Sequence, residues 1–145
     1  MIYVSVSDDL INFPQIEKIA KGVAVVLESN AGIYPRFLGH LSGLDNHPLA
    51  KEYKLSKLHI ALSNAELNSK HWRKPKGQSR TSNNFVIFVR HWLAPEYVRI
   101  LAIIHPNAHE RINSLIPLLV KKAEKQFFNL GKPELIALNN HTKPL

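Results

Sequence analysis

The sequence predicts an α+β domain in which a small antiparallel sheet, made of an N-terminal strand and a C-terminal meander, packs with helices on one side. Three patterns support this fold class. Apolar and polar residues alternate in residues 2–6, apolar residues recur with helical spacing in residues 14–29, and strand-like runs in residues 57–106 precede a second helical pattern. The chain, residues 1–145, has the length of one domain with its own core, and we expect a single domain.

The N-terminal part is expected to contain a strand, a helix and a long loop. "IYVSV", residues 2–6, has the alternation of a half-buried strand. A helix is expected between about Pro14 and Ser29, because proline suits a first helical turn and the apolar residues that follow share one face. Residues 33–56 are rich in Gly, Pro, Asp and Asn, which predicts an ordered loop with at most a short helix near residues 49–53.

The C-terminal part is expected to contain the meander, a helix and a tail. β-branched and aromatic residues predict three strands in "KLHIAL" (57–62), "NNFVIFVRHW" (83–92) and "EYVRILAIIHP" (96–106). The helix should begin at Asn107, because Asn107 and Glu110 are spaced as a capping box, and Pro117 should kink or divide it. From about residue 129 we expect a loosely held tail in which residues 135–138 dock.

Composition and charge narrow the function. The net charge is +8, which favours a polyanionic or acidic partner. Because the chain has no cysteine, disulfides and thiolate sites are excluded, in agreement with a reducing compartment. No signal peptide and no apolar run long enough to span a bilayer is apparent, so we expect a cytoplasmic protein that does not contact membranes.

A basic segment without acidic residues lies in mid-chain. No Asp or Glu occurs from Leu67 to Pro95, and this segment includes the loop "HWRKPKGQSRTSNNF", residues 71–85. Cations interleaved with indole rings suit phosphates and stacked bases. The residues expected to bind RNA are Arg73, Lys74, Lys76, Arg90 and Trp72.

Four residues are candidates for catalysis. His59 alternates with apolar neighbours on its strand, which places it on the open face of the sheet, although an ordinary surface histidine is the alternative. Arg80 lies where the basic loop enters the next strand, where a guanidinium can clamp a phosphate; a solvated loop arginine is the alternative. His109 lies in a first helical turn, whose free N–H groups attract anions, and His105 at the end of the preceding strand is a second member. For these two, a polar first-turn residue and a strand terminus are the alternatives.

These residue types suit RNA cleavage through the 2′-hydroxyl of the substrate. Such cleavage needs a base for the hydroxyl proton, cations for the phosphorane charge and an acid for the leaving 5′-oxygen. No carboxylate cluster and no zinc-binding pattern is apparent, so we expect neither a metal nor another cofactor. Which residue is the base and which the acid stays open. The alternatives to an enzyme are a non-catalytic basic module that binds nucleic acid and a protein-interaction module.

Four motifs, taken in order, resemble the YafO family of type II toxin–antitoxin toxins. They are "PRFLG" (35–39), "LHIAL" (58–62), "SRTSNN" (79–84) and "RILAIIHPNAHE" (99–110), and the resemblance covers about residues 33–128. It implies a RelE-like fold and a ribosome-dependent mRNA interferase, an endoribonuclease that acts in the 30S A site and inhibits translation. The implied partners are mRNA, the ribosome and a cognate antitoxin from the same operon.

The resemblance supports some candidate residues more than others. His59, Arg80 and His109 fall on positions shared with the family motifs. The other candidates, His105 among them, are supported only by local chemistry. The chain departs from the family in its longer basic loop, in the histidine before Pro106 and in the tail after Phe128. The basic loop would track RNA phosphates, and it would also suit an acidic antitoxin segment.

Overall fold

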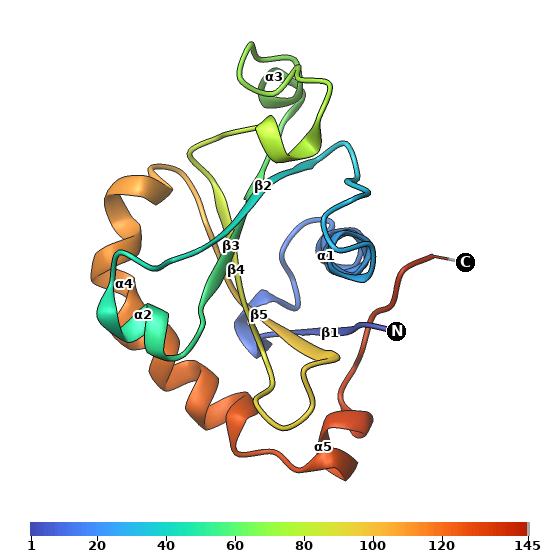
Figure 1. The fold of residues 1–145 in the computed structure, drawn as a ribbon, viewed down its shortest axis with the longest axis vertical. Coiled ribbons are helices and arrows are strands. Elements are labelled where there is room, and N and C mark those ends of the chain that lie inside the picture. Colours follow the sequence, from blue (N-terminus) through green and yellow to red (C-terminus); the bar gives the residue numbers. More distant parts are fainter. Residues whose placement is uncertain (145) are drawn as a thin grey trace.

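A computed structural model describes residues 1–144, and a five-stranded sheet lies at its centre (Figure 1). The strands are β1 (Tyr3–Val6), β2 (Leu38–Gly43), β3 (Ser56–Ile60), β4 (Phe85–Arg90) and β5 (Tyr97–Ile104). They lie side by side in the order β1-β5-β4-β3-β2. The α+β class predicted from the sequence is confirmed, and each of the four runs predicted as strands overlaps one.

The sheet is mixed, so the prediction of an antiparallel sheet is wrong at one pair of strands. β1 runs parallel to β5, whereas β5, β4, β3 and β2 pair antiparallel with one another. Parallel neighbours cannot be joined by a tight hairpin and need a long crossover. Here all of the chain between β1 and β5 forms that crossover, and the N-terminal strand becomes an outer strand next to β5.

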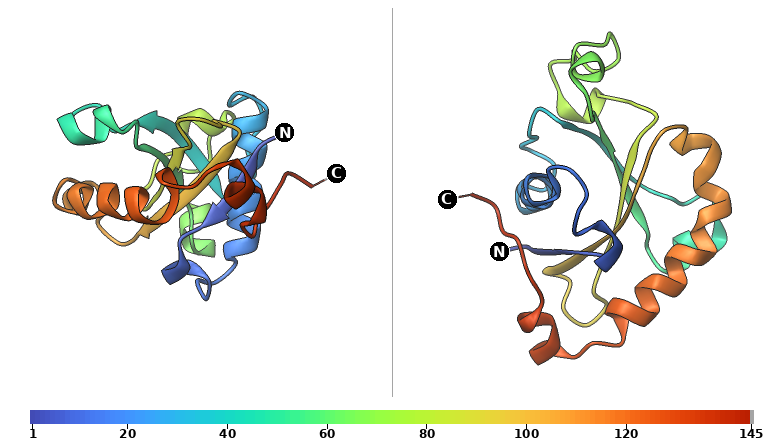
Figure 2. Two further views of the ribbon diagram at one scale, coloured as in Figure 1. Left: turned by 90° about the horizontal axis from the view of Figure 1, so that it is seen from below. Right: turned by 180° about the vertical axis from the view of Figure 1, so that it is seen from behind.

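Helices cover both faces of the sheet, α1 (Ile16–Glu28) on one side and α4 (Ala108–Ala123) on the other (Figure 2). Neighbouring residues of a strand point to opposite faces. Phe85 and Ile87 therefore pack in the core next to α4, and Val86 packs in the core next to α1. The expectation of helices on one side and an open second face is wrong. The unbroken apolar run of β4 is typical of a strand buried on both faces.

The N-terminal helix agrees with its prediction. α1 ends where Asn30 and Ala31 adopt left-handed conformations, with φ of 52° and 62°. Gly22 in mid-helix leaves room for an aromatic ring, because a Cβ atom at this position would lie 2.7 Å from Cζ of Phe37. The short helix expected near residues 49–53 is α2 (Pro48–Glu52).

The strand β2 lies within the segment that was predicted to be a loop, and this part of the prediction is wrong. Two glycines, Gly39 and Gly43, made the segment resemble a series of turns. Gly39 is needed for close packing rather than for a turn. A Cβ atom there would lie 2.7 Å from the backbone oxygen of Arg80 and 2.9 Å from Cη2 of Trp72.

The C-terminal part is more ordered than expected. α4 runs through Pro117 without being divided and continues into a π-helical turn, Glu124–Phe128. The short helix α5 (Lys132–Ala137) follows, and its Leu135 is buried, as predicted. His141 then exchanges two backbone hydrogen bonds of 2.7 and 2.8 Å with Val4. Residues 132–141 are thus attached to the domain by a helix and a bridge to β1, while residue 145 lies outside the described residues. Among residues 1–144, every helix is too short or too polar to span a bilayer.

Candidate active site

Asn83, in the turn between the basic loop and β4, caps the helix α4. Its backbone oxygen accepts from Ala108 N at 3.0 Å, its Oδ1 accepts from His109 N at 2.8 Å, and its Nδ2 donates to Glu110 at 3.1 Å. The capping box predicted from Asn107 is wrong, because Asn107 is left-handed, with φ of 61°, and makes no side-chain cap. The bond from Asn83 holds the pKa of Glu110 below its ordinary value.

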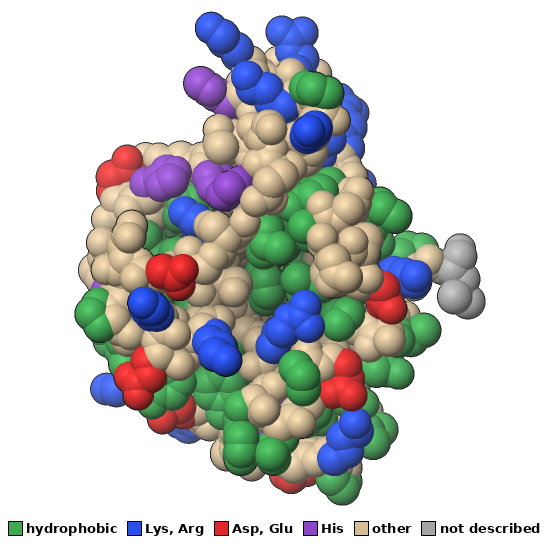
Figure 3. All heavy atoms as spheres, in the orientation of Figure 1, with side chains coloured by type: hydrophobic (Ala, Val, Ile, Leu, Met, Phe, Trp, Pro, Cys, Tyr) green, Lys and Arg blue, Asp and Glu red, His purple; other side chains and the backbone are tan. Residues whose placement is uncertain are grey.

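Three histidine rings meet beside the capped helix end, and we call them the histidine cluster: His40 from β2, His59 from β3 and His109 from α4. The ring centroids of His40 and His109 each lie 5.7 Å from that of His59. The ring of Phe85 packs against two of these rings, with its centroid 4.9 Å from that of His59 and 4.7 Å from that of His109. Lys57 extends over the same phenyl ring, with Nζ 4.3 Å from its centroid. The space-filling view shows histidine side chains grouped on one face (Figure 3).

His59 is buried and uncharged. Only 3% of its surface is exposed, because α4 returns over the face that we expected to be open. Its Nδ1 accepts a 2.8 Å hydrogen bond from the backbone N–H of Ser82, so the neutral ring carries its proton on Nε2. Burial, with the charges of Lys57, His109 and His40, lowers the pKa of His59 to about 4. At neutral pH this ring is therefore a hydrogen-bond donor at Nε2 rather than a cation.

The imidazole of His40 carries its proton on the other ring nitrogen. Its Nδ1 lies 2.9 Å from the backbone oxygen of Gln78. A carbonyl oxygen only accepts hydrogen bonds, so this contact places the imidazole proton on Nδ1 and leaves the Nε2 lone pair free. The cluster thus brings together one ring that offers an N–H group and one that offers a lone pair.

The basic loop belongs to a small lobe, residues 63–80, that contains α3 (Asn64–Leu67) and stands beyond the end of the sheet (Figure 1). Arg73, Lys74 and Lys76 are exposed on this lobe, and lysine and arginine side chains are grouped there in the space-filling view (Figure 3). Their role in RNA binding stays a prediction, and their exposure is compatible with it.

Trp72 is not a surface for stacking bases, and this prediction is wrong. Its side chain is only 3% exposed, and its Nε1 donates a 2.7 Å hydrogen bond to the backbone oxygen of Arg36. The ring packs against Gly39, where a larger residue would collide with it. Trp72 therefore attaches the basic lobe to the segment that leads into β2.

Arg80 also anchors the lobe. Its Nη1 donates to the backbone oxygens of Pro35 and Leu38, both at 3.0 Å, and its own backbone oxygen accepts from His40 N at 2.9 Å. A clamp on phosphate through the rest of this guanidinium stays a prediction. The side chain is half-buried rather than a solvated loop arginine.

Two further candidates lie apart from the histidine cluster. The imidazole of His105 packs edge-on against Phe13, with a centroid distance of 5.6 Å, on the side of the sheet that α1 covers. Arg90 lies at the far end of β4 from Phe85, and its Nη1 donates to the backbone oxygen of Pro95 at 3.2 Å. Five residue steps along a strand amount to about 17 Å, so Arg90 does not lie on the basic lobe.

Sequence reasoning missed His40, Lys57 and Asn83 as members of the site. His40 was missed because β2 was taken for a loop. Lys57 could have been predicted as a member of the site from the alternation of β3, because residues 57 and 59 share a face. Asn83 gave no signal, because its partners are more than twenty residues away in the sequence. Among residues 1–144, no group of three or more His, Cys, Asp or Glu side chains is placed to hold a metal ion.

The mixed sheet between helices is compatible with the RelE-like class of toxin folds. Residues 27–129 match the model of the family described as toxin YafO of the type II toxin–antitoxin system, and the chain belongs to this family. Membership implies a cognate antitoxin as a partner. No curated protein and no solved structure gives a significant match to the chain.

The protonation of His59 predicts a pH-dependent loss of stability. The pKa of this ring is about 4 in the folded chain, below its ordinary value of 6.5. The unfolded chain therefore binds more protons between these values, and stability falls as the pH falls from 6.5 towards 4. Between pH 7 and pH 5 the free energy of unfolding should fall by about 2 kcal/mol more in the wild type than in His59→Asn, which keeps an acceptor for Ser82 N. Denaturant titrations at the two pH values measure this difference; equal losses would show that His59 is not held neutral.

The bonds of Arg80 predict that this residue contributes to stability. Arg80→Ala removes the donor to two backbone oxygens beside β2, and it should lower the free energy of unfolding by about 1–3 kcal/mol. The exposed Lys76 is a matched control, since Lys76→Ala should change stability by no more than about 0.5 kcal/mol. Thermal denaturation of both variants decides the matter, and an Arg80→Ala protein as stable as the control would contradict the anchoring role.

Proposed function

We propose that this toxin is an mRNA interferase, a ribosome-dependent endoribonuclease that inhibits translation in the cytoplasm by cleaving mRNA in the 30S A site. The observation that carries the proposal is the histidine cluster beside the capped end of α4 and within the reach of a basic lobe. Membership of a family of type II toxins supports it as well. The cluster supplies groups for proton transfer, while the lobe supplies cations for phosphates.

The proposed reaction needs no nucleophile from the protein. The 2′-hydroxyl of the substrate loses its proton to a base, the P–O2′ bond forms, the P–O5′ bond breaks, and an acid protonates the leaving 5′-oxygen. His40 is the better base, because its Nε2 lone pair is free. His109 is exposed at the first turn of α4 and is assigned as the acid. The products would be a 2′,3′-cyclic phosphate and a 5′-hydroxyl.

The negative charge of the phosphorane needs stabilising groups at the same place. The N-terminal end of α4 carries partial positive charge, and Lys57 lies in contact with the phenyl ring below the cluster. Neutral His59 can donate its Nε2–H group to a phosphate oxygen between the two proton-transferring rings. The protein would therefore act by placing donors around one phosphate.

Removal of the proton-transferring rings is the direct test of this proposal. His40→Ala and His109→Ala should each lower the rate of ribosome-dependent mRNA cleavage on the order of a hundredfold or more, because a general acid or base is lost. Both would act on one transition state, so the double variant should lose much less than the product of the two effects. The rates and the chemistry of the ends can be measured by mapping transcript ends.

The control for this experiment is His105→Ala, another exposed histidine, which lies on the other side of the sheet and should cleave like the wild type. Full activity of His109→Ala at matched protein levels would remove this residue from the mechanism. Growth inhibition without any cleaved transcripts would favour the non-catalytic alternative.

The basic lobe predicts binding that depends on salt. Lys74→Glu with Lys76→Glu should weaken binding to RNA or ribosomes, because phosphate contacts release counterions. The slope of log affinity against log salt should become flatter, by roughly 0.7 for each lost contact with a single strand. Lys51→Glu with Lys54→Glu, which changes one exposed lysine in α2 and one in the turn that follows it, is the control. Equal slopes for the wild type and the lobe variant would exclude these two lysines as phosphate contacts.

A further inference from the structure

A groove runs along α1, on the face of the sheet opposite to the histidine cluster. It consists of two adjoining hollows of about 790 and 730 Å³ that share Phe13, Gln15, Lys18 and Phe37. The second hollow reaches Ile60 and the segment after it, where the chain leaves β3 for the basic lobe. Nothing in the proposed cleavage reaction uses this surface.

The floor of the groove is apolar and aromatic. Ile16 and Val25 of α1 line one hollow, and the half-buried rings of Phe13 and Phe37 line both. The ring of Phe37 lies against α1 because residue 22 is a glycine. Aromatic groups at the bottom of a groove are typical of surfaces that bind protein segments, where they provide most of the binding energy.

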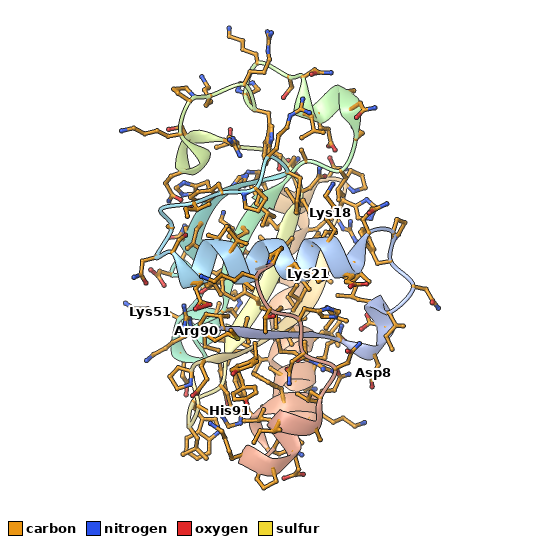
Figure 4. All side chains as sticks on the ribbon, turned by 90° about the vertical axis from the view of Figure 1, so that its right-hand side faces the viewer. Asp8, Lys18, Lys21, Lys51, Arg90 and His91 are labelled. Carbon is orange, nitrogen blue, oxygen red and sulfur yellow. The ribbon has the colours of Figure 1, made fainter. Side chains whose placement is uncertain are left out.

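The rim of the groove is basic. Lys18 and Lys21 project from α1 on the side of the molecule drawn in Figure 4. Lys18 Nζ lies 5.3 Å from the centroid of the Phe37 ring, directly beside the apolar floor. Lys21 is paired at 2.9 Å with Glu17, the acidic residue of the rim, and an exposed pair of this kind contributes little to stability. An acidic segment with apolar side chains would complement both the rim and the floor.

We propose that this groove is where the cognate antitoxin anchors, through a segment that presents apolar side chains to Phe13 and Phe37 and carboxylates to Lys18 and Lys21. The inference rests on the family, which requires such a partner, and not on the cleavage mechanism. α1 has 13 residues and is therefore about 20 Å long. Two turns of helix would cover about half of that length, and an extended segment of about six residues would follow all of it.

RNA bound for cleavage would lie on the other face of the sheet. The alternating residues of β3 show that the two sites lie on opposite faces, since Ile60 lines the groove whereas His59 belongs to the cluster. An antitoxin anchored in the groove leaves the histidine rings uncovered. The part of the antitoxin that blocks cleavage must therefore extend beyond the groove, past the segment after β3.

Charge reversal on the rim tests the inference by a measurement of binding. Lys18→Glu with Lys21→Glu should weaken the affinity of the full-length toxin for the purified product of the adjacent antitoxin gene by tenfold or more, measured by calorimetry. The variant should still inhibit growth, and the antitoxin should no longer relieve this inhibition. Lys51→Glu with Lys54→Glu carries the same charge change at α2 and should bind the antitoxin like the wild type.

A second measurement needs no substitution. Amide hydrogen exchange in residues 13–25 and 61–64 should be slower in the wild-type complex than in the free toxin. An unchanged affinity of the rim variant, an equal loss in the α2 control, or protection confined to other segments would each overturn the inference. A rim variant that binds the antitoxin normally but loses affinity for RNA would do the same. Because binding is measured apart from cleavage, failure of this inference leaves the proposed function untouched.

Discussion

The structure of the site depends on one short turn, residues 82–84, that fixes three separate parts of the chain. Ser82 donates its backbone N–H group to Nδ1 of His59, and Asn83 caps α4. Asn84 is buried and donates to Glu66 in α3 at 2.6 Å, which ties the base of the basic lobe to the sheet. A strand, a helix and the lobe are thus bonded to three consecutive residues, and the bonds of Ser82 and Asn83 hold His59 and the helix end that carries His109.

The lobe is also attached to the segment around the start of β2, through two residues that the sequence analysis predicted to contact RNA. Trp72 and Arg80 donate to the backbone oxygens of Pro35, Arg36 and Leu38, which lie in the turn before β2 and at the first residue of this strand. Leaving a backbone oxygen unpaired when it is covered costs free energy. The indole N–H group of Trp72 and the guanidinium of Arg80, which are distant in sequence, donate hydrogen bonds to these oxygens. Burial of the anchors leaves the short run of exposed cations, Arg73 to Lys76, as the basic surface of the lobe.

Local patterns predicted most of the fold, whereas long-range contacts decided the site. The periodicity of α1, β3 and α4 was sufficient to place those elements, and the alternation of β3 correctly assigned His59 to the face opposite to Leu58. Its burial was not predictable, because it depends on where α4 returns. The cap of α4 was assigned to Asn107 by its spacing, although Asn83 makes it, since spacing detects only partners close in sequence.

The electrostatics of the cluster suit the binding of an anion. His59 stays neutral because it is buried and because Lys57 and two other imidazoles surround it, so a positive charge there would be repelled and poorly solvated. A phosphate group bound among these side chains would bring the opposite charge to the same place. It would raise the pKa of His59 by offsetting the positive charges around this ring. A phosphate would therefore supply the negative charge that the buried His59, Lys57 and the neighbouring imidazoles lack.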